Sequence, residues 1–128
     1  MLAPMTQPLA LVVYEKLLPG SQLVNRLQDL NYRVQAVTGA ESLVACAEAE
    51  KPMLVLADLT TAHQDVCAAI GHLRQNPVTS HIPVIAFGPE TAVDLQTSAL
   101  AAGAVLATSE TAVLSHLAEL LEQALHVE

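Results

Sequence analysis

Short runs of consecutive apolar residues alternate along the chain with longer segments in which apolar residues recur every three or four positions. The clearest run spans residues 53–57, where five apolar residues stand between Pro52 and Asp58. An apolar run without alternation is typical of a strand that is buried on both faces in a parallel sheet. Covering both faces requires helices above and below the sheet, so this run predicts an α/β layer architecture.

The other elements follow the same alternation. Pro19 favours a helix start after the first strand, and residues 38–41 (Thr-Gly-Ala-Glu) have the spacing of a capping box before the second helix. Gly103 is placed to end the fourth helix, and Thr108 or Ser109 can cap the last one. Besides the strand at residues 53–57, four more strands are predicted, at residues 9–13, 33–37, 83–88 and 104–107. Helices are expected over about residues 19–30, 38–50, 64–75, 89–102 and 109–125.

These elements are expected to form one domain over residues 9–128, after a lead-in at residues 1–8 that contains two prolines. Parallel strands joined by right-handed crossovers leave few topologies. The predicted fold is a doubly wound, five-stranded parallel sheet in the order 2-1-3-4-5, flanked by five helices. The first and third strands are neighbours in this order, so we expect Glu15 and Asp58 to face each other at the carboxyl edge of the sheet. Ligands gather at that edge in open α/β sheets.

The charge balance argues against several classes of function. Thirteen acidic residues against five basic ones give a formal charge of −8. Nucleic acids and anionic membrane surfaces require clustered Lys and Arg, whereas these residues are scattered along this sequence. No apolar run reaches the length of about 18 residues of a membrane span, and the first residues lack the pattern of a signal peptide. A cytoplasmic protein is therefore expected.

The chain carries unusually few charges for its apolar content. Only 14% of residues are charged and 52% are hydrophobic, whereas about 25% charged residues is typical of soluble domains. So few charges leave apolar surface uncovered, which favours a protein partner or self-association. Cys46 and Cys67 stand in predicted helices without a CxxC spacing and are expected to be buried thiols. The five histidines are dispersed, without the spacing of metal ligands.

Several short segments agree in spacing with one known pattern. They are Leu-Asn-Tyr-Arg-Val at residues 30–34, Leu-Ala-Asp-Leu at 56–59, Leu-Arg at 73–74, Ile-Pro-Val-Ile at 82–85 and Ala-Ala-Gly-Ala at 101–104. Together with an acidic residue after the first strand, these segments resemble the receiver domain of two-component response regulators, over nearly the whole chain from Leu9 to Leu125. Because the segments stand in register, they support the same fold as the periodicity does.

The resemblance implies a specific chemistry. In receivers an aspartate at the end of the third strand accepts a phosphoryl group, and Asp58 stands at that position. Acidic residues after the first strand help to hold Mg²⁺, so Glu15, Asp58 and the backbone carbonyl of Thr60 are candidate metal ligands. A Ser or Thr after the fourth strand and a Lys after the fifth bind the phosphoryl oxygens. Their movement, with that of an aromatic residue on the fifth strand, relays the signal.

This sequence departs from the family at most of these positions. Tyr14 stands in the first acidic position and leaves only Glu15 as a carboxylate there, so Mg²⁺ is expected to bind weakly. Gly88 replaces the hydroxyl residue, Thr108 stands in the region of the Lys, and Val105 stands in that of the aromatic. The Lys is absent under any alignment, because both lysines of the chain precede the fourth strand. Nothing obvious would then neutralise a transferred phosphoryl group.

Two functions stay open at this point. The first is a degenerate, or pseudo-receiver, signalling domain that acts by protein–protein interaction in a two-component or phosphorelay pathway. The second is a functional single-domain response regulator that a histidine kinase or phosphotransfer protein phosphorylates on Asp58. An enzyme is not expected, because the sequence has no GxGxxG, P-loop or GxSxG pattern and no flavin phosphate loop after the first strand.

The expected partner is a protein, either a histidine kinase, a phosphotransfer protein or a downstream regulator. Many receivers pair through the surface of the fourth helix, the fifth strand and the last helix, and the resemblance implies a homodimer through the same surface here. The small residues Ala99 and Ala102 are expected to allow close approach in it. No cofactor other than weakly bound Mg²⁺ is expected.

Overall fold

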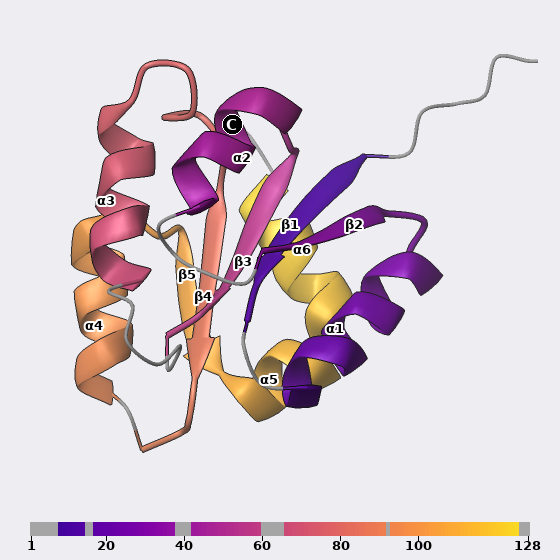
Figure 1. Cartoon of the computed structure of the whole chain (residues 1–128). Coiled ribbons are helices and arrows are strands. Elements are labelled where there is room, and N and C mark those ends of the chain that lie inside the picture. The colour runs from indigo at the N-terminus through magenta and orange to yellow at the C-terminus, as the bar shows by residue number, and fades with distance from the viewer. Residues whose placement is uncertain (1–7, 15–16, 38–41, 60–65, 92, 126–128) are drawn as a thin grey trace, which may run out of the picture.

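The computed structural model describes residues 8–14, 17–37, 42–59, 66–91 and 93–125. Within these residues the chain forms a parallel sheet with helices on both faces (Figure 1). The order β2-β1-β3-β4-β5 and the parallel pairing of all neighbours confirm the predicted topology. The strands are β1 (Leu9–Val13), β2 (Arg33–Val37), β3 (Leu54–Asp58), β4 (Val84–Gly88) and β5 (Leu106–Ser109).

The helices cover the two faces in groups of three, with α2, α3 and α4 on one face and α1, α5 and α6 on the other (Figure 1). The sheet therefore separates two apolar clusters, and successive side chains of a strand point into different ones. Val55 belongs to the first cluster and Leu56 to the second. In the described ranges, no helix is long and apolar enough to cross a bilayer. The helices are α1 (Leu17–Asp29), α2 (Leu43–Glu50), α3 (Val66–Gln75), α4 (Val93–Ala102), α5 (Glu110–Ser115) and α6 (Leu117–Leu125).

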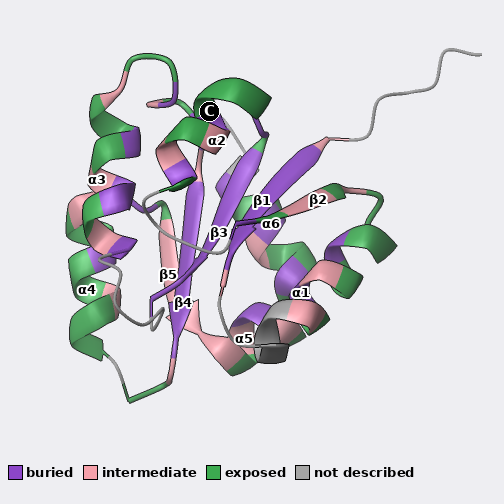
Figure 2. Ribbon diagram, viewed as in Figure 1, coloured by how far each residue is buried: buried purple, intermediate pink, exposed green. Residues whose placement is uncertain are grey.

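The central strand is β3, in agreement with the apolar run that predicts it. All residues of β3, and of its neighbours β1 and β4, are buried (Figure 2). Because helices cover both faces, no position in these strands faces water, and this explains why their sequences show no polar alternation. The strand begins one residue later than predicted, since Met53 precedes it and is 49% exposed.

Two helix starts differ from the predicted ones. The first helix begins at Leu17, so Pro19 lies inside its first turn, where the missing N–H of a proline leaves no helical hydrogen bond unmade. The fourth helix begins at Val93, four residues after the predicted start at Pro89. The capping box predicted at residues 38–41 lies outside the described residues.

The end of α4 is confirmed at Gly103, and it shifts the strand that follows. Gly103 has a φ of 128°, in the region where a glycine is favoured after a helix. The Ala104 amide donates to the Ala99 carbonyl at 3.0 Å, so Ala104 still belongs to the turn that closes the helix. The strand β5 consequently begins at Leu106 rather than at residue 104, and Val105 precedes it.

The last helix was expected to be continuous but consists of two helices, which gives six rather than five in the described part of the chain. His116 separates them with a φ of −121°, and its amide donates to the Ala112 carbonyl at 2.8 Å. Val113, Leu117 and Leu121 are nevertheless all buried against the sheet. The break therefore leaves the predicted apolar face of this segment in place.

The two small residues expected at an interface differ in burial. Ala99 on α4 is fully buried, whereas Ala102 at the end of the same helix is half-buried against the first apolar cluster. The prediction that Ala99 faces a partner is wrong, because the helix uses it for its own close packing on the sheet, and for Ala102 it stays a prediction. The large apolar residues exposed on α4 and before β5 include Val93, Leu100 and Val105.

The cysteines belong to α2 and α3, and neither forms a disulfide. Cys46 and Cys67 are half-buried, rather than fully buried as expected, and both pack against the cluster beneath these helices. They serve there as small apolar side chains.

Candidate functional site

Asp58 is held at the carboxyl end of the central strand. It is the last residue of β3, is 1% exposed, and pairs with Phe87 on β4. The Leu59 amide that follows it donates to the Phe87 carbonyl at 2.8 Å, which fixes the backbone where the strand ends. This position agrees with the one predicted from the apolar run, and it presents a carboxyl group at the edge where ligands of α/β sheets bind.

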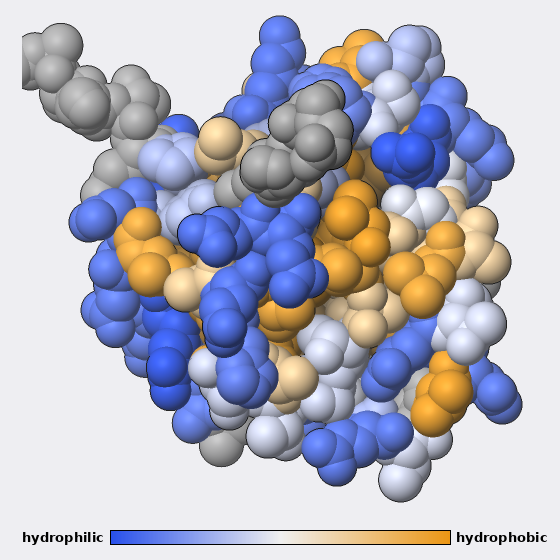
Figure 3. Space-filling view, turned by 180° about the vertical axis from the view of Figure 1, so that it is seen from behind, coloured by the Kyte–Doolittle hydropathy of each residue, from blue (hydrophilic) through white to orange (hydrophobic). Residues whose placement is uncertain are grey.

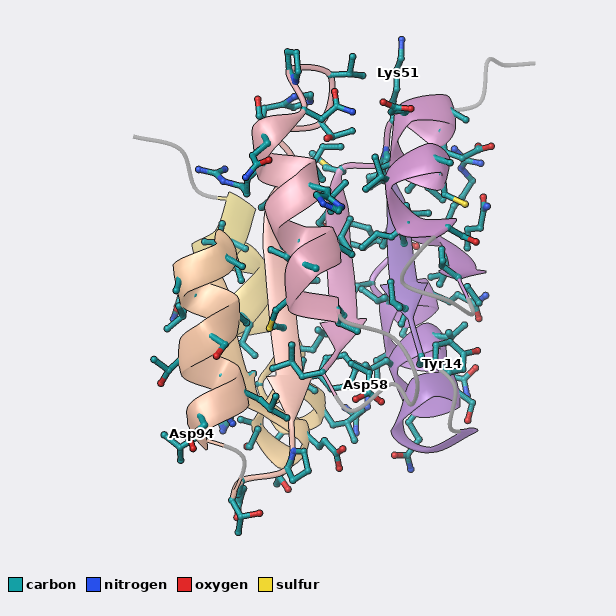
Figure 4. The ribbon with its side chains drawn as sticks, turned by 60° about the vertical axis from the view of Figure 1, so that its left-hand side comes forward. Tyr14, Lys51, Asp58 and Asp94 are labelled. Carbon is teal, nitrogen blue, oxygen red and sulfur yellow. The ribbon has the colours of Figure 1, made fainter. Side chains whose placement is uncertain are left out.

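Tyr14 lies beside Asp58 at the same edge. Val13 pairs with Ala57, so Tyr14 and Asp58 are the next residues of the two adjacent strands (Figure 4). The Tyr14 amide donates to the Val37 carbonyl at 3.2 Å, and its half-buried side chain packs against the second apolar cluster. Tyr14 therefore fills space at the position where receivers carry a carboxylate.

The predicted magnesium site is only partly covered by the structure. Of its candidate ligands, Asp58 is described, while Glu15 and Thr60 lie outside the described residues. Among the residues that are described, no three His, Cys, Asp or Glu side chains lie together as a metal site would require. The described part of the site, one carboxylate beside a tyrosine, is not enough for Mg²⁺, which takes oxygen ligands in a strict octahedral arrangement. A magnesium site here stays a prediction that depends on Glu15 and Thr60.

The ends of β4 and β5 provide little that could contact a group on Asp58. Gly88, the buried last residue of β4, has no side chain, and it pairs with Ser109 on β5. Thr108 pairs with Phe87, one position earlier. The residue at the carboxyl end of β5 is thus Ser109 and not Thr108, a difference that follows from the later start of this strand.

The Ser109 hydroxyl is already used by the protein. Its Oγ accepts a hydrogen bond from the Ala112 amide at 3.1 Å and so caps the start of α5. The strand β4 lies between Ser109 and Asp58, and two strand spacings amount to about 10 Å. A serine side chain is much shorter than that, whereas a lysine could cover most of the distance. Ser109 cannot replace the missing lysine.

Val105 and Lys51 lie at the amino edge of the sheet, opposite the carboxyl edge that holds Asp58. Val105 is 42% exposed, and its amide donates to the carbonyl of Val84, the first residue of β4. Val105 therefore precedes the fifth strand, on which it was expected to lie, and its role as the degenerate counterpart of the family's aromatic residue stays a prediction. Lys51 lies at the same far end of the sheet from Asp58 (Figure 4).

Neither a protein-family model nor a curated protein matches this sequence, but solved structures match its fold. The receiver domain of the sensor histidine kinase PA1611 from Pseudomonas aeruginosa, with magnesium in its active-site cleft, is 21% identical with a TM-score of 0.83, covering 94% of this chain and 98% of that one. The receiver domain of NtrX from Brucella abortus is 20% identical with a TM-score of 0.83, covering 93% and 99%. The signal receiver domain of a diguanylate cyclase from Desulfovibrio desulfuricans is 22% identical with a TM-score of 0.79, covering 94% and 95%.

These likenesses extend over complete receiver domains, while the chain spans only 27% of a longer NtrX structure. At 20–22% identity they concern the path of the backbone and leave the chemistry of the site open. The parallel sheet in the order β2-β1-β3-β4-β5 agrees with them. This chain therefore has the fold of response-regulator receiver domains.

Proposed function

We propose that this chain is a receiver-like signalling domain that acts by binding another protein, with a phosphorylation switch that is disconnected. The supporting observation is the pair of residues that end β4 and β5. Gly88 offers no side chain, and the Ser109 hydroxyl caps α5. In the receivers that the sequence resembles, a hydroxyl residue and a lysine at these ends receive the phosphoryl oxygens.

The energetic argument concerns what a phosphoryl group could stabilise. Attached to Asp58, it would replace the carboxyl group with an acyl phosphate of about −2 charge in an already acidic chain. A ligand shifts a conformational equilibrium only by the difference in its affinity for the two states. The contacts that supply this difference in receivers are missing at Gly88 and Ser109, so modification would leave β4, β5 and α4 as they are.

The second candidate function is a working single-domain regulator. It is favoured by the retention of Asp58, since a carboxyl group that is 1% exposed is costly to bury and contributes nothing to an apolar core. In this alternative a histidine kinase or phosphotransfer protein phosphorylates Asp58, and Glu15 with Thr60 completes the magnesium site.

Beryllofluoride with Mg²⁺, which imitates the phosphoryl group, separates the two functions. We expect the amide NMR shifts of Gly88, Leu106 and α4 to stay nearly unchanged when it is added, because no side chain there can move toward Asp58. The magnesium-binding PA1611 receiver domain serves as the positive control for the reagent. Large shifts at Gly88 and Leu106 that disappear in Asp58→Asn would support the working regulator instead.

The proposal makes the chain a binding module rather than an enzyme. Its partner would be a histidine kinase, a phosphotransfer protein or a downstream regulator in the cytoplasm. Asp58→Asn keeps the size and shape of the side chain, so we expect this variant to fold normally and to retain partner binding.

A homodimer through α4 and the region of β5 is part of the proposal. Val93, Leu100 and Val105 are 60%, 49% and 42% exposed, and Val93 and Leu100 are seven residues apart on one side of α4. No charged residue stands between Asp94 and Glu110 to oppose the approach of a second copy. An apolar area bordered by hydrophilic residues is visible in Figure 3 on the side turned away in Figure 1.

Light scattering at micromolar concentration tests this dimer. We expect the wild type to be a dimer and Leu100→Glu to be a monomer, because the substitution places a charge in the apolar area. Leu30→Glu is a matched control, since Leu30 is 39% exposed but follows α1. A monomeric wild type, or equal dissociation by both substitutions, would contradict a dimer through this surface.

A further inference from the structure

A groove crosses the amino edge of the sheet, opposite Asp58. Its main part is a hollow of about 650 Å³, within the size range of ligand sites. A second hollow of about 490 Å³ adjoins it and shares Leu9 and Arg33 with it. The residues of this amino-edge groove that matter here are Leu9, Arg33, Lys51, Met53, His81 and Pro83.

The shape of the groove suits an extended chain. Because β2, β1, β3 and β4 are consecutive neighbours, Arg33, Leu9, Met53 and Pro83 stand in a row at or before their amino ends. Backbone hydrogen bonds hold the row, with the Met53 amide donating to the Leu9 carbonyl at 2.8 Å and the Val55 amide to the Pro83 carbonyl at 3.0 Å. The row from β2 to β4 covers three strand spacings, or about 14 Å. A bound peptide would span this length with roughly four extended residues.

The charge of the groove is opposite to that of the protein. The chain has a formal charge of −8 and five Lys and Arg residues in all. Arg33, Lys51 and His81 line the groove, and Glu50 is the one carboxylate among its described lining residues. Tyr32 lines the second hollow, and burial raises the pKa of its phenol. Cationic groups above an apolar floor complement a ligand that carries carboxylates and apolar side chains.

The backbone of Lys51 supports a role for its side chain. Lys51 ends α2 with φ 51° and ψ 59°, in the left-handed region that favours glycine or asparagine at a helix end. A lysine there is strained, and strain that persists in a fold is a reason to look for a function. Figure 4 shows Lys51 projecting at the end of the molecule remote from Asp58.

We propose that the amino-edge groove binds an extended acidic peptide segment of a partner protein, with apolar residues between its carboxylates. The carboxylates pair with Arg33 and Lys51, and the apolar residues lie on Leu9, Met53 and Pro83. This inference does not depend on Asp58 or on the proposed phosphorylation state. The groove would give the protein a second contact surface on the side away from the candidate site.

A capped hexapeptide of alternating glutamate and leucine is the probe for this groove. Titrated into the ¹⁵N-labelled protein, it should shift the amides of Arg33, Lys51, Met53 and His81 in a saturable way and leave that of Asp58 unchanged. A peptide with glutamine in place of glutamate is the control for apolar binding alone. No saturable shift at the groove, or equal affinity of both peptides, would overturn the proposal.

Variants separate the role of charge from that of folding. Lys51→Gly removes the cation and relieves the backbone strain, so the peptide should bind about fivefold more weakly while the Tm rises. Arg33→Gln should weaken binding to a similar extent. Arg26→Gln, which removes an exposed cation on α1 outside the groove, should leave the peptide affinity unchanged. If Lys51→Gly fails to fold, Lys51→Asn provides the same test. Unchanged peptide affinity in the variants that lack the charge of Lys51 or Arg33 would refute the proposal that these cations bind the peptide carboxylates.

Discussion

Replacing Leu56 with Ala should lower the free energy of unfolding by about 2–5 kcal/mol, the largest effect expected of a single substitution proposed for this protein. Leu56 is completely buried in the second apolar cluster and is flanked by Val12 on β1 and Ile85 on β4. The loss combines the transfer free energy of the removed methyl groups with the cost of a cavity. Strands on both sides and helices above hinder the collapse of that cavity.

Urea unfolding followed by circular dichroism measures the effect. Leu30→Ala is the matched control, because it deletes the same atoms from a residue that is 39% exposed after α1 and lies outside the proposed dimer surface. It should change stability by no more than about 0.5 kcal/mol. Equal losses at the two positions would contradict the burial of β3 under helices on both faces.

Gly103→Ala should destabilise the protein by about 2–3 kcal/mol. A Cβ at this position would clash with the Arg74 Cγ, and the φ of 128° is strained for any residue with a side chain. Arg74 cannot move aside without cost, since its Nη1 donates to the Ser80 carbonyl at 2.8 Å. The substitution should therefore disturb the packing of α3 against the end of α4.

Gly71→Ala is the control, and it should change the stability of the protein in the opposite direction. Gly71 lies inside α3, and the nearest described atom outside this helix to an added Cβ would be the Ala102 carbonyl oxygen, at the ordinary contact distance of 4.0 Å. Alanine should here stabilise the helix by about 0.5–1 kcal/mol. Thermal unfolding of both variants side by side would show the contrast, and a gain in stability for Gly103→Ala would contradict the described turn.

The candidate site could be predicted from sequence only in its central part. An apolar run that ends in a carboxylate places Asp58 at the edge of the sheet, because the strand and its end are both local features. The positions on β5 were misplaced by about two residues, since Ala104 and Val105 suit a turn or a strand equally well. The hydrogen bond from the Ala104 amide to the Ala99 carbonyl decides between them, and no periodicity reveals it.

The surface of α4 could not be predicted for a related reason. Apolar residues are spread around this helix, so its sequence does not distinguish the side that faces the sheet. Contact with the sheet buries Ala99 and leaves Val93 and Leu100 exposed. The amino-edge groove was missed as well, because Arg33, Lys51 and His81 belong to three separate segments that look scattered along the chain.

The number, type and order of the strands and the position of Asp58 follow from the amino-acid sequence alone. Hydrophobic periodicity records whether a segment is covered on one face or on both, and chain topology then permits few arrangements. Three further features come from the folded protein: the start of β5, the side of α4 that meets the sheet, and the set of distant cations that share a groove. These features depend on contacts between segments far apart in the chain, and a residue's neighbours in sequence carry no information about such contacts.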